Sequence, residues 1–166
     1  VELADIGPGM RVLEPSAGTG NIAAEVRHQI AKLSAQAEDA PALVCVEISH
    51  ELCEQLERHG YNNAKHGPGQ YNTGTVRCED FLTTDPDSVG LFDRVVMNPP
   101  FENASDIKHI QHALKFLKPG GVLVGICADG PRQNAWLEEH ATHIEKLPAG
   151  TFAGTQVRTA MFTIDA

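Results

Sequence analysis

The sequence has 166 residues, of which 42% are hydrophobic and 21% are charged. This length fits one globular domain over residues 1–166 that buries a core without disulfides or metals. The formal net charge is -9, whereas a domain that binds nucleic acid on its own usually carries an excess of basic residues. The sequence has no signal peptide and no long apolar span, which predicts a cytoplasmic protein without membrane contact.

Apolar runs alternate with helical patterns along the chain. Strands are predicted at residues 11–14, 42–48, 75–79, 92–97, 122–127, 144–147 and 157–164. Helices are predicted at 21–33, at 132–140 and after Ser49, which caps the helix that follows it. A further helix is predicted from the apolar face of Ile107, Ile110, Leu114 and Leu117, and it is expected to end at Pro119-Gly120-Gly121. Residues 60–74 read as a long loop, and the segment before the fourth strand is too short and polar for a full helix.

This order of elements predicts a Rossmann-like, doubly wound α/β sheet with helices on both faces. The last two strands have no helix between them, and a parallel pair would need a long crossover. The last strand is therefore predicted to run antiparallel.

The four cysteines, Cys45, Cys53, Cys78 and Cys127, form no C-x-x-C pair, and three of them fall in predicted strands. They are expected to be reduced, buried thiols. The histidines are scattered and form no metal-binding motif, so no metal cofactor is predicted.

A glycine-rich turn, Glu14-Pro15-Ser16-Ala17-Gly18-Thr19-Gly20, joins the first strand to the first helix. Gly18 and Gly20 let the backbone approach a ligand closely, and the helix N-terminus offers free N–H groups. Glu14 would repel a pyrophosphate but would suit the ammonium group of an amino acid. The turn therefore favours S-adenosylmethionine over a dinucleotide.

Acidic residues follow the next two strands. Glu47 ends the second strand, where a carboxylate accepts hydrogen bonds from ribose hydroxyls in nucleoside-binding sheets. Asp80 follows the third strand and is expected to accept from an adenine amino group, with Ile48 or Phe81 packing on the ring.

Asn98-Pro99-Pro100-Phe101 follows the fourth strand as a rigid, extended turn. An exocyclic amino nitrogen is a poor nucleophile because its lone pair is delocalised into the ring. The Asn98 side-chain oxygen and the Pro99 carbonyl could accept its two protons and free that lone pair. Phe101 could stack on the acceptor ring.

These two turns make the sequence resemble class I S-adenosylmethionine-dependent methyltransferases, in the amino-methyltransferase branch with an N-P-P-[FYW] motif. The resemblance implies a strand order of 3-2-1-4-5-7-6. It also implies that the turn from Glu14 to Gly20 holds the methionine end, Glu47 the ribose and Asp80 the adenine, and that Asn98, Pro99 and Phe101 serve the acceptor. Residues 154–159 look like the last hairpin of bacterial and phage adenine methyltransferases.

The sequence departs from that family in having no helix before the first strand, or one upstream of Val1, and no target-recognition domain. A nucleic-acid substrate, DNA before RNA, is expected through a partner chain, an oligomer or a missing domain. The alternatives are RNA adenine, cytosine N4, a protein glutamine amide, or a non-catalytic S-adenosylmethionine-binding subunit. A dehydrogenase is disfavoured by Glu14 and by the Asn98–Phe101 turn.

Overall fold

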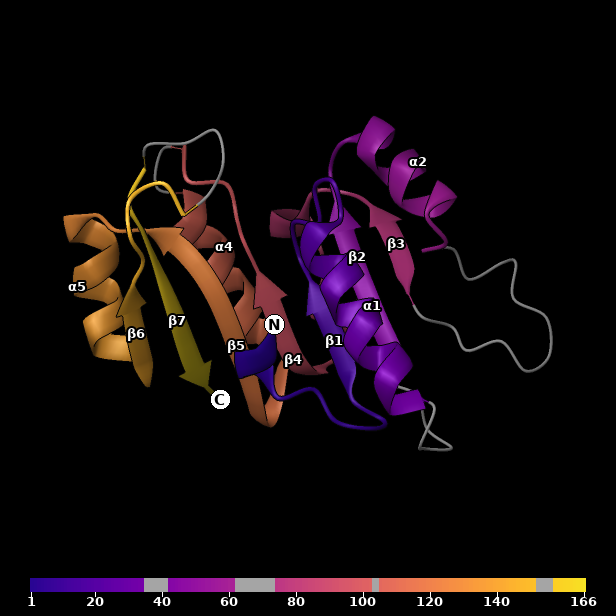
Figure 1. Cartoon of the computed structure of the whole chain (residues 1–166), viewed down its shortest axis with the longest axis horizontal. Helices are drawn as coiled ribbons and strands as arrows, with labels where there is room; N and C mark the ends of the chain where they lie inside the picture. The colour runs from indigo at the N-terminus through magenta and orange to yellow at the C-terminus, as the bar shows by residue number, and fades with distance from the viewer. Residues whose placement is uncertain (35–41, 62–73, 103–104, 152–156) are drawn as a thin grey trace.

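The computed structural model describes residues 1–34, 42–61, 74–102, 105–151 and 157–166. Their strands form one sheet in the order β3-β2-β1-β4-β5-β7-β6 (Figure 1). The strands are β1 (Arg11–Glu14), β2 (Ala42–Glu47), β3 (Thr75–Cys78), β4 (Phe92–Met97), β5 (Leu117–Ala128), β6 (His143–Lys146) and β7 (Thr159–Asp165). The pairs among β1 to β5 are parallel, and β7 is antiparallel to β5 and β6. The predicted fold class, strand order and reversed strand are confirmed.

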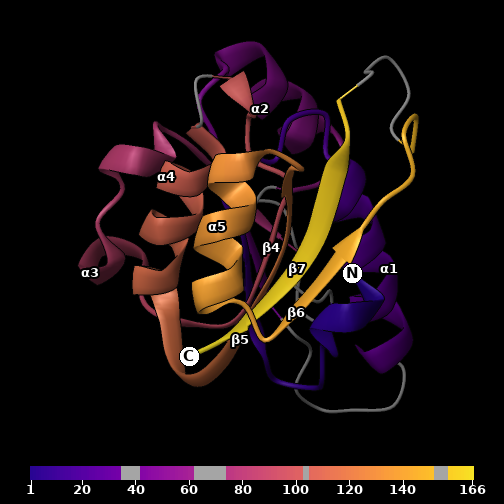
Figure 2. The same ribbon diagram turned by 90° about the vertical axis from the view of Figure 1, so that its left-hand side faces the viewer.

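Helices cover both faces of this sheet (Figure 2). One face carries α1 (Asn21–Ser34), α2 (His50–Arg58) and the 3-10 turn η1 (Glu2–Ala4). The other carries α4 (Ser105–Ala113) and α5 (Pro131–His140), with the short α3 (Pro86–Val89) beside them. Among the described residues, no helix is long and apolar enough to cross a membrane.

The core lies on both sides of the sheet because its central strands point alternate side chains to opposite faces. Val12 packs with α1 residues such as Val26 and Ile30, whereas the adjacent Leu13 packs with Phe92 and Phe116 on the other face. All six side chains are fully buried. This double burial explains why the strands appear in the sequence as continuous apolar runs.

The predicted end of the helix on Ile107, Ile110, Leu114 and Leu117 is wrong. Leu117 and Pro119-Gly120-Gly121 lie inside β5, where Leu117 pairs with Phe92 and the register then shifts. Gly120 has φ +76°, and a Cβ on Gly121 would lie 2.9 Å from the Lys118 carbonyl oxygen. The glycines thus form an irregularity within a strand, as bulges often require.

The N-terminal residues pack on the sheet, with Ala4 and Ile6 buried against its α1 face. Ser49 caps α2 as predicted, because its side chain accepts a hydrogen bond from the Leu52 backbone N–H. Most of the predicted loop at 60–74, and part of the predicted hairpin motif at 154–159, lie outside the described residues.

Candidate functional site

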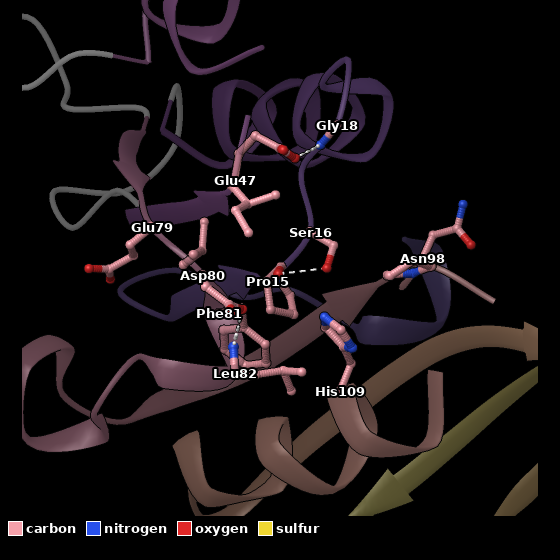
Figure 3. Close-up of a pocket in the computed structure, with 13 residues that line it drawn as sticks. Pro15, Ser16, Gly18, Glu47, Glu79, Asp80, Phe81, Leu82, Asn98 and His109 are labelled. Carbon is pink, nitrogen blue, oxygen red and sulfur yellow. Dashed lines mark hydrogen bonds between the residues drawn. The ribbon is translucent and has the colours of Figure 1, made fainter. Parts of the chain in front are cut away.

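A cavity of about 540 Å³ lies at the carboxyl ends of the central strands (Figure 3). Its volume falls in the range of small-molecule sites. Its lining residues are Pro15, Ser16, Gly18, Val46, Glu47, Ile48, Glu79, Asp80, Phe81, Leu82, Asn98, Pro100 and His109. β2 and β3 lie on one side of β1 and β4 lies on the other, so the cavity is at the topological switch point where open α/β sheets bind ligands.

The glycine turn is held to β2 by one backbone hydrogen bond and by one carboxylate. The Ala17 N–H donates to the Val46 carbonyl at 3.0 Å, and the Gly18 N–H donates to Glu47 Oε2 at 2.7 Å. The other oxygen, Glu47 Oε1, accepts from the Ser49 N–H at 2.8 Å. Glu47 therefore fixes the turn and the start of α2, while each carboxylate oxygen keeps a lone pair for a ligand hydroxyl.

The two glycines of the turn are required for different reasons. Gly18 has φ +55°, a left-handed conformation that side-chain-bearing residues rarely adopt, and it lines the cavity. Gly20 has φ +85°, and a Cβ there would lie 2.7 Å from the Leu56 side chain. Gly20 thus allows α1 to start close to α2, and it lies outside the lining of the main cavity.

Glu14 lies behind the turn rather than at the cavity surface. Its side chain is 1% exposed, and it accepts a weak hydrogen bond from the Cys45 thiol at 3.9 Å. Burial raises the pKa of Glu14 well above its ordinary value, and the nearby Glu47 charge adds to this. A contact of Glu14 with a ligand ammonium remains a prediction, because this carboxyl does not line the cavity.

The adenine side of the predicted site is formed by the segment after β3. Asp80 Oδ1 accepts from the Leu82 N–H at 2.9 Å and so caps the 3-10 turn η3 (Phe81–Thr83). The Phe81 ring is 3% exposed and lies 5.2 Å from the Phe116 ring, which makes it part of the core. Ile48 is 66% exposed and lines the cavity, so it is the apolar side chain free to pack on a ligand ring.

A third carboxylate, Glu79, also lines the cavity. Arg77 pairs with it at 2.7 Å, and the hydrogen bond from Arg77 lowers the pKa of Glu79. Thr84 Oγ1 donates to the same carboxylate at 3.2 Å. Glu79 is therefore held in its charged form and is already matched by a cation.

The predicted catalytic turn borders the opposite side of the cavity. Figure 3 places Asn98 across Pro15 and Ser16 from the acidic side chains, with its amide extending away from Asp80. Pro100 lines the cavity, and its carbonyl accepts from Ser105 Oγ at 2.9 Å, which ties the turn to α4. Pro99 is buried, and Phe101 is half-buried outside the lining.

The structure thus gathers nine of the predicted residues around one cavity: Pro15, Ser16, Gly18, Glu47, Ile48, Asp80, Phe81, Asn98 and Pro100. Glu14, Ala17, Gly20, Pro99 and Phe101 lie outside its lining. Ala17 and Pro99 are buried supports of the two turns.

His109 of α4 was not predicted, yet it lines the cavity. Its Nδ1 lies 2.8 Å from the Ser105 carbonyl oxygen. A carbonyl oxygen only accepts, so Nδ1 carries a proton, and in the neutral ring Nε2 is left as an acceptor. Nothing in the sequence distinguishes this histidine from the others; only the position of α4 beside the Asn98 turn does.

The lining of the cavity contains three carboxylates and no lysine or arginine. Such a site suits a ligand with cationic and hydroxyl groups and disfavours a pyrophosphate. Within the described part of the chain, no group of three histidine, cysteine or acidic side chains is arranged to hold a metal ion.

No protein-family model and no curated protein matches this sequence. Solved structures share its fold. TrmN from Thermus thermophilus is 19% identical with a TM-score of 0.69, and the match covers 99% of this chain and 46% of that chain. The chain therefore spans about half the length of TrmN.

Two further structures match over more of their own length. An rRNA methylase from Streptococcus thermophilus is 12% identical with a TM-score of 0.61, and the match covers 98% of this chain and 91% of that one. A protein described as a predicted O-methyltransferase, Atu636 from Agrobacterium tumefaciens, is 19% identical with a TM-score of 0.63. This match covers 97% of this chain and 76% of that one. At these identities the likeness establishes the fold alone.

Proposed function

We propose that the chain binds S-adenosylmethionine in this cavity and directs its methyl group to an exocyclic amino nitrogen of a nucleobase. The observation that carries the proposal is the meeting of the Gly18 turn, Glu47, Asp80 and Asn98 around one acidic cavity at the switch point. The fold neighbours support methyl transfer, since structures described as an rRNA methylase and as a predicted O-methyltransferase share the fold.

The lining fits the proposed cofactor group by group. The lone pairs left on the Glu47 carboxylate can accept from ribose hydroxyls, and Asp80 Oδ2 can accept from an adenine amino group. Ile48 offers an exposed apolar surface for the ring. S-adenosylmethionine, when bound, supplies an activated methyl group on a positively charged sulfur, and an acidic lining tolerates that charge.

The amino acceptor is inferred from Asn98 and Pro99. Their oxygens are acceptors without strong basicity, so they can hold an amino group by its protons and localise its lone pair. The Ser105 bond to the Pro100 carbonyl keeps the turn in place. The fold alone does not decide the acceptor atom, because Atu636, described as a predicted O-methyltransferase, has it too.

Adenine is the proposed base, with DNA as the first substrate because of the resemblance of the Asn98–Phe101 turn. RNA is the second candidate, because a neighbour of the same fold is described as an rRNA methylase. The net charge of -9 supports a partner or a further domain that supplies the basic surface for the phosphate backbone.

The test is transfer of a tritiated methyl group to DNA, RNA and protein offered in parallel. We expect label on adenine. Asn98→Ala should lower turnover about 100- to 1,000-fold, the usual loss when one polar group that supports the transition state is removed. Cofactor affinity, measured by calorimetry, should stay close to that of the parent.

Asp80→Ala is the contrasting variant. It should weaken cofactor binding by about 1–3 kcal/mol, the cost of losing one hydrogen-bond acceptor for the ligand. Equal turnover in Asn98→Ala and the parent would remove Asn98 from the reaction. Bound cofactor with no transfer to any of the three substrates would instead favour a binding subunit.

A further inference from the structure

Cys53 and Cys78 meet between α2 and β3, behind the Glu47 wall of the cavity. Cys78 is the last residue of β3 and pairs in register with Glu47. Cys53 lies in α2, is 4% exposed, and donates its thiol proton to the Glu47 carbonyl at 3.3 Å. The Cys78 thiol lies close enough to Cys53 to contribute to the raised pKa of Cys53.

The register of the sheet explains why these side chains face each other. Cys45 and Glu47 alternate with Val46 along β2, and their partners on β3 are Val76 and Cys78. Cys45 and Val76 pack in the core under α1 and α2, so Cys78 projects to that same face. Cys53 points inward from α2 onto it.

Cys78 has the surroundings of a reactive thiol. It is exposed, which corrects the prediction that this cysteine is buried, and its Sγ lies 3.2 Å from His50 Nδ1 at the start of α2. An imidazole at this distance can take the thiol proton as the sulfur attacks.

The other cysteines lack these features. Cys45 and Cys127 are fully buried, and burial raises the pKa of Cys127 to about 12. Burial and the neighbouring Cys78 also raise the pKa of Cys53 to about 12, so Cys53 stays a protonated thiol at neutral pH.

We propose that Cys78 is a peroxide-reactive thiol and that Cys53 resolves it to a reversible disulfide. The Cys78 sulfur attacks one oxygen of a hydroperoxide, the O–O bond breaks, and the thiol proton passes through His50 to the leaving oxygen. This step yields a sulfenic acid and, from hydrogen peroxide, one water. The Cys53 sulfur then attacks the Cys78 sulfur, the S–O bond breaks, and hydroxide leaves with the Cys53 proton as a second water.

The sulfur pair loses two electrons in these steps and the peroxide gains them, so no further reactant is needed. The disulfide would replace the Cys53 bond to the Glu47 carbonyl and link α2 to the end of β3. The chemistry is independent of the proposed methyl transfer.

The experiment treats the full 166-residue chain with hydrogen peroxide and follows it by thiol alkylation and mass spectrometry. We expect a loss of two hydrogens, a peptide link between Cys53 and Cys78, free thiols at Cys45 and Cys127, and full reversal by dithiothreitol. Cys53→Ser should stop at a sulfenic acid on Cys78 that dimedone traps. Cys78→Ser should not react, and His50→Ala should slow the first step.

Dimedone trapping on the unmodified chain at short times gives the same site assignment if a variant fails to fold. Sulfenic acid first on Cys53, a disulfide that uses Cys45 or Cys127, or a link only between chains would each overturn the proposal.

Discussion

Glu14 holds a carboxyl group inside the core at the end of β1. It is 1% exposed, and burial raises its pKa well above the ordinary value. Glu14 directly precedes the glycine turn in the sequence, but residue types do not reveal on which side of a turn a side chain lies. Packing against Cys45 decides that.

The raised pKa makes stability depend on pH. The native chain keeps a proton on Glu14 that the unfolded chain releases once the pH exceeds the ordinary glutamate value, so the free energy of unfolding falls as pH rises toward the folded pKa. Glu14→Gln should remove this slope and stabilise the protein at neutral pH, on the order of 1–3 kcal/mol. Urea unfolding from pH 5 to 8 measures it, with the exposed Glu25→Gln as control. If the free energy of unfolding changed with pH equally in Glu14→Gln and the parent, this prediction would be contradicted.

Ile48 is the large apolar side chain that the cavity leaves open. We expect Ile48→Ala to leave stability nearly unchanged, because the side chain is already 66% exposed. It should weaken S-adenosylmethionine binding by about 1–2 kcal/mol, roughly 5- to 30-fold in Kd, since each buried methylene is worth about 0.8 kcal/mol. Calorimetry checks this against Leu91→Ala, which is 40% exposed and outside the cavity. Equal losses of cofactor affinity in both variants would exclude a contact between Ile48 and the ligand ring.

At the scale of elements, Asp106 joins α4 to two neighbours on the acceptor side. The carboxylate is 0% exposed and accepts from the Ala128 N–H at 3.2 Å and from Gln133 Nε2 at 3.0 Å. The end of β5 and the start of α5 are thus fixed against the helix that carries Ser105 and His109.

Asp106→Asn should destabilise the protein by about 1–3 kcal/mol, because an amide has one acceptor oxygen where the carboxylate uses two. Denaturant unfolding should show a lower midpoint with an unchanged slope. The matched change at exposed Asp87 should have little effect. An unchanged midpoint in Asp106→Asn would mean that Gln133 reorients to satisfy the amide.

Much of the element pattern could be predicted from the sequence. The strands at 11–14 and 92–97 have the predicted bounds, because turns or charged residues flank short apolar runs. The prediction that Pro119-Gly120-Gly121 ends a helix is wrong because the same residue types end helices and form strand irregularities. Only the pairing of Leu117 with Phe92 in the sheet distinguishes the two cases. The position of His109 in the cavity lining and the exposure of Cys78 depend on which elements pack together. The sequence of one segment does not encode that packing.

At the scale of the whole molecule, both the candidate ligand site and the chain as a whole are acidic. At a concentration 100 times its Kd, a ligand stabilises the native state by about 2.7 kcal/mol, which for a domain of this size raises Tm by roughly 5–10 °C. We expect S-adenosylmethionine to produce this shift in differential scanning fluorimetry and NAD to produce none. A shift with NAD alone would refute the cofactor assignment.

The position of β7 has a consequence for synthesis of the chain. β6 is made before β7, yet its pairing partner in the sheet is β7, which lies between it and β5. A nascent or truncated chain that ends before Thr159 would leave β6 detached and one edge of β5 open. Open strand edges pair with other chains, so such a product is expected to aggregate until the ribosome has delivered the last strand.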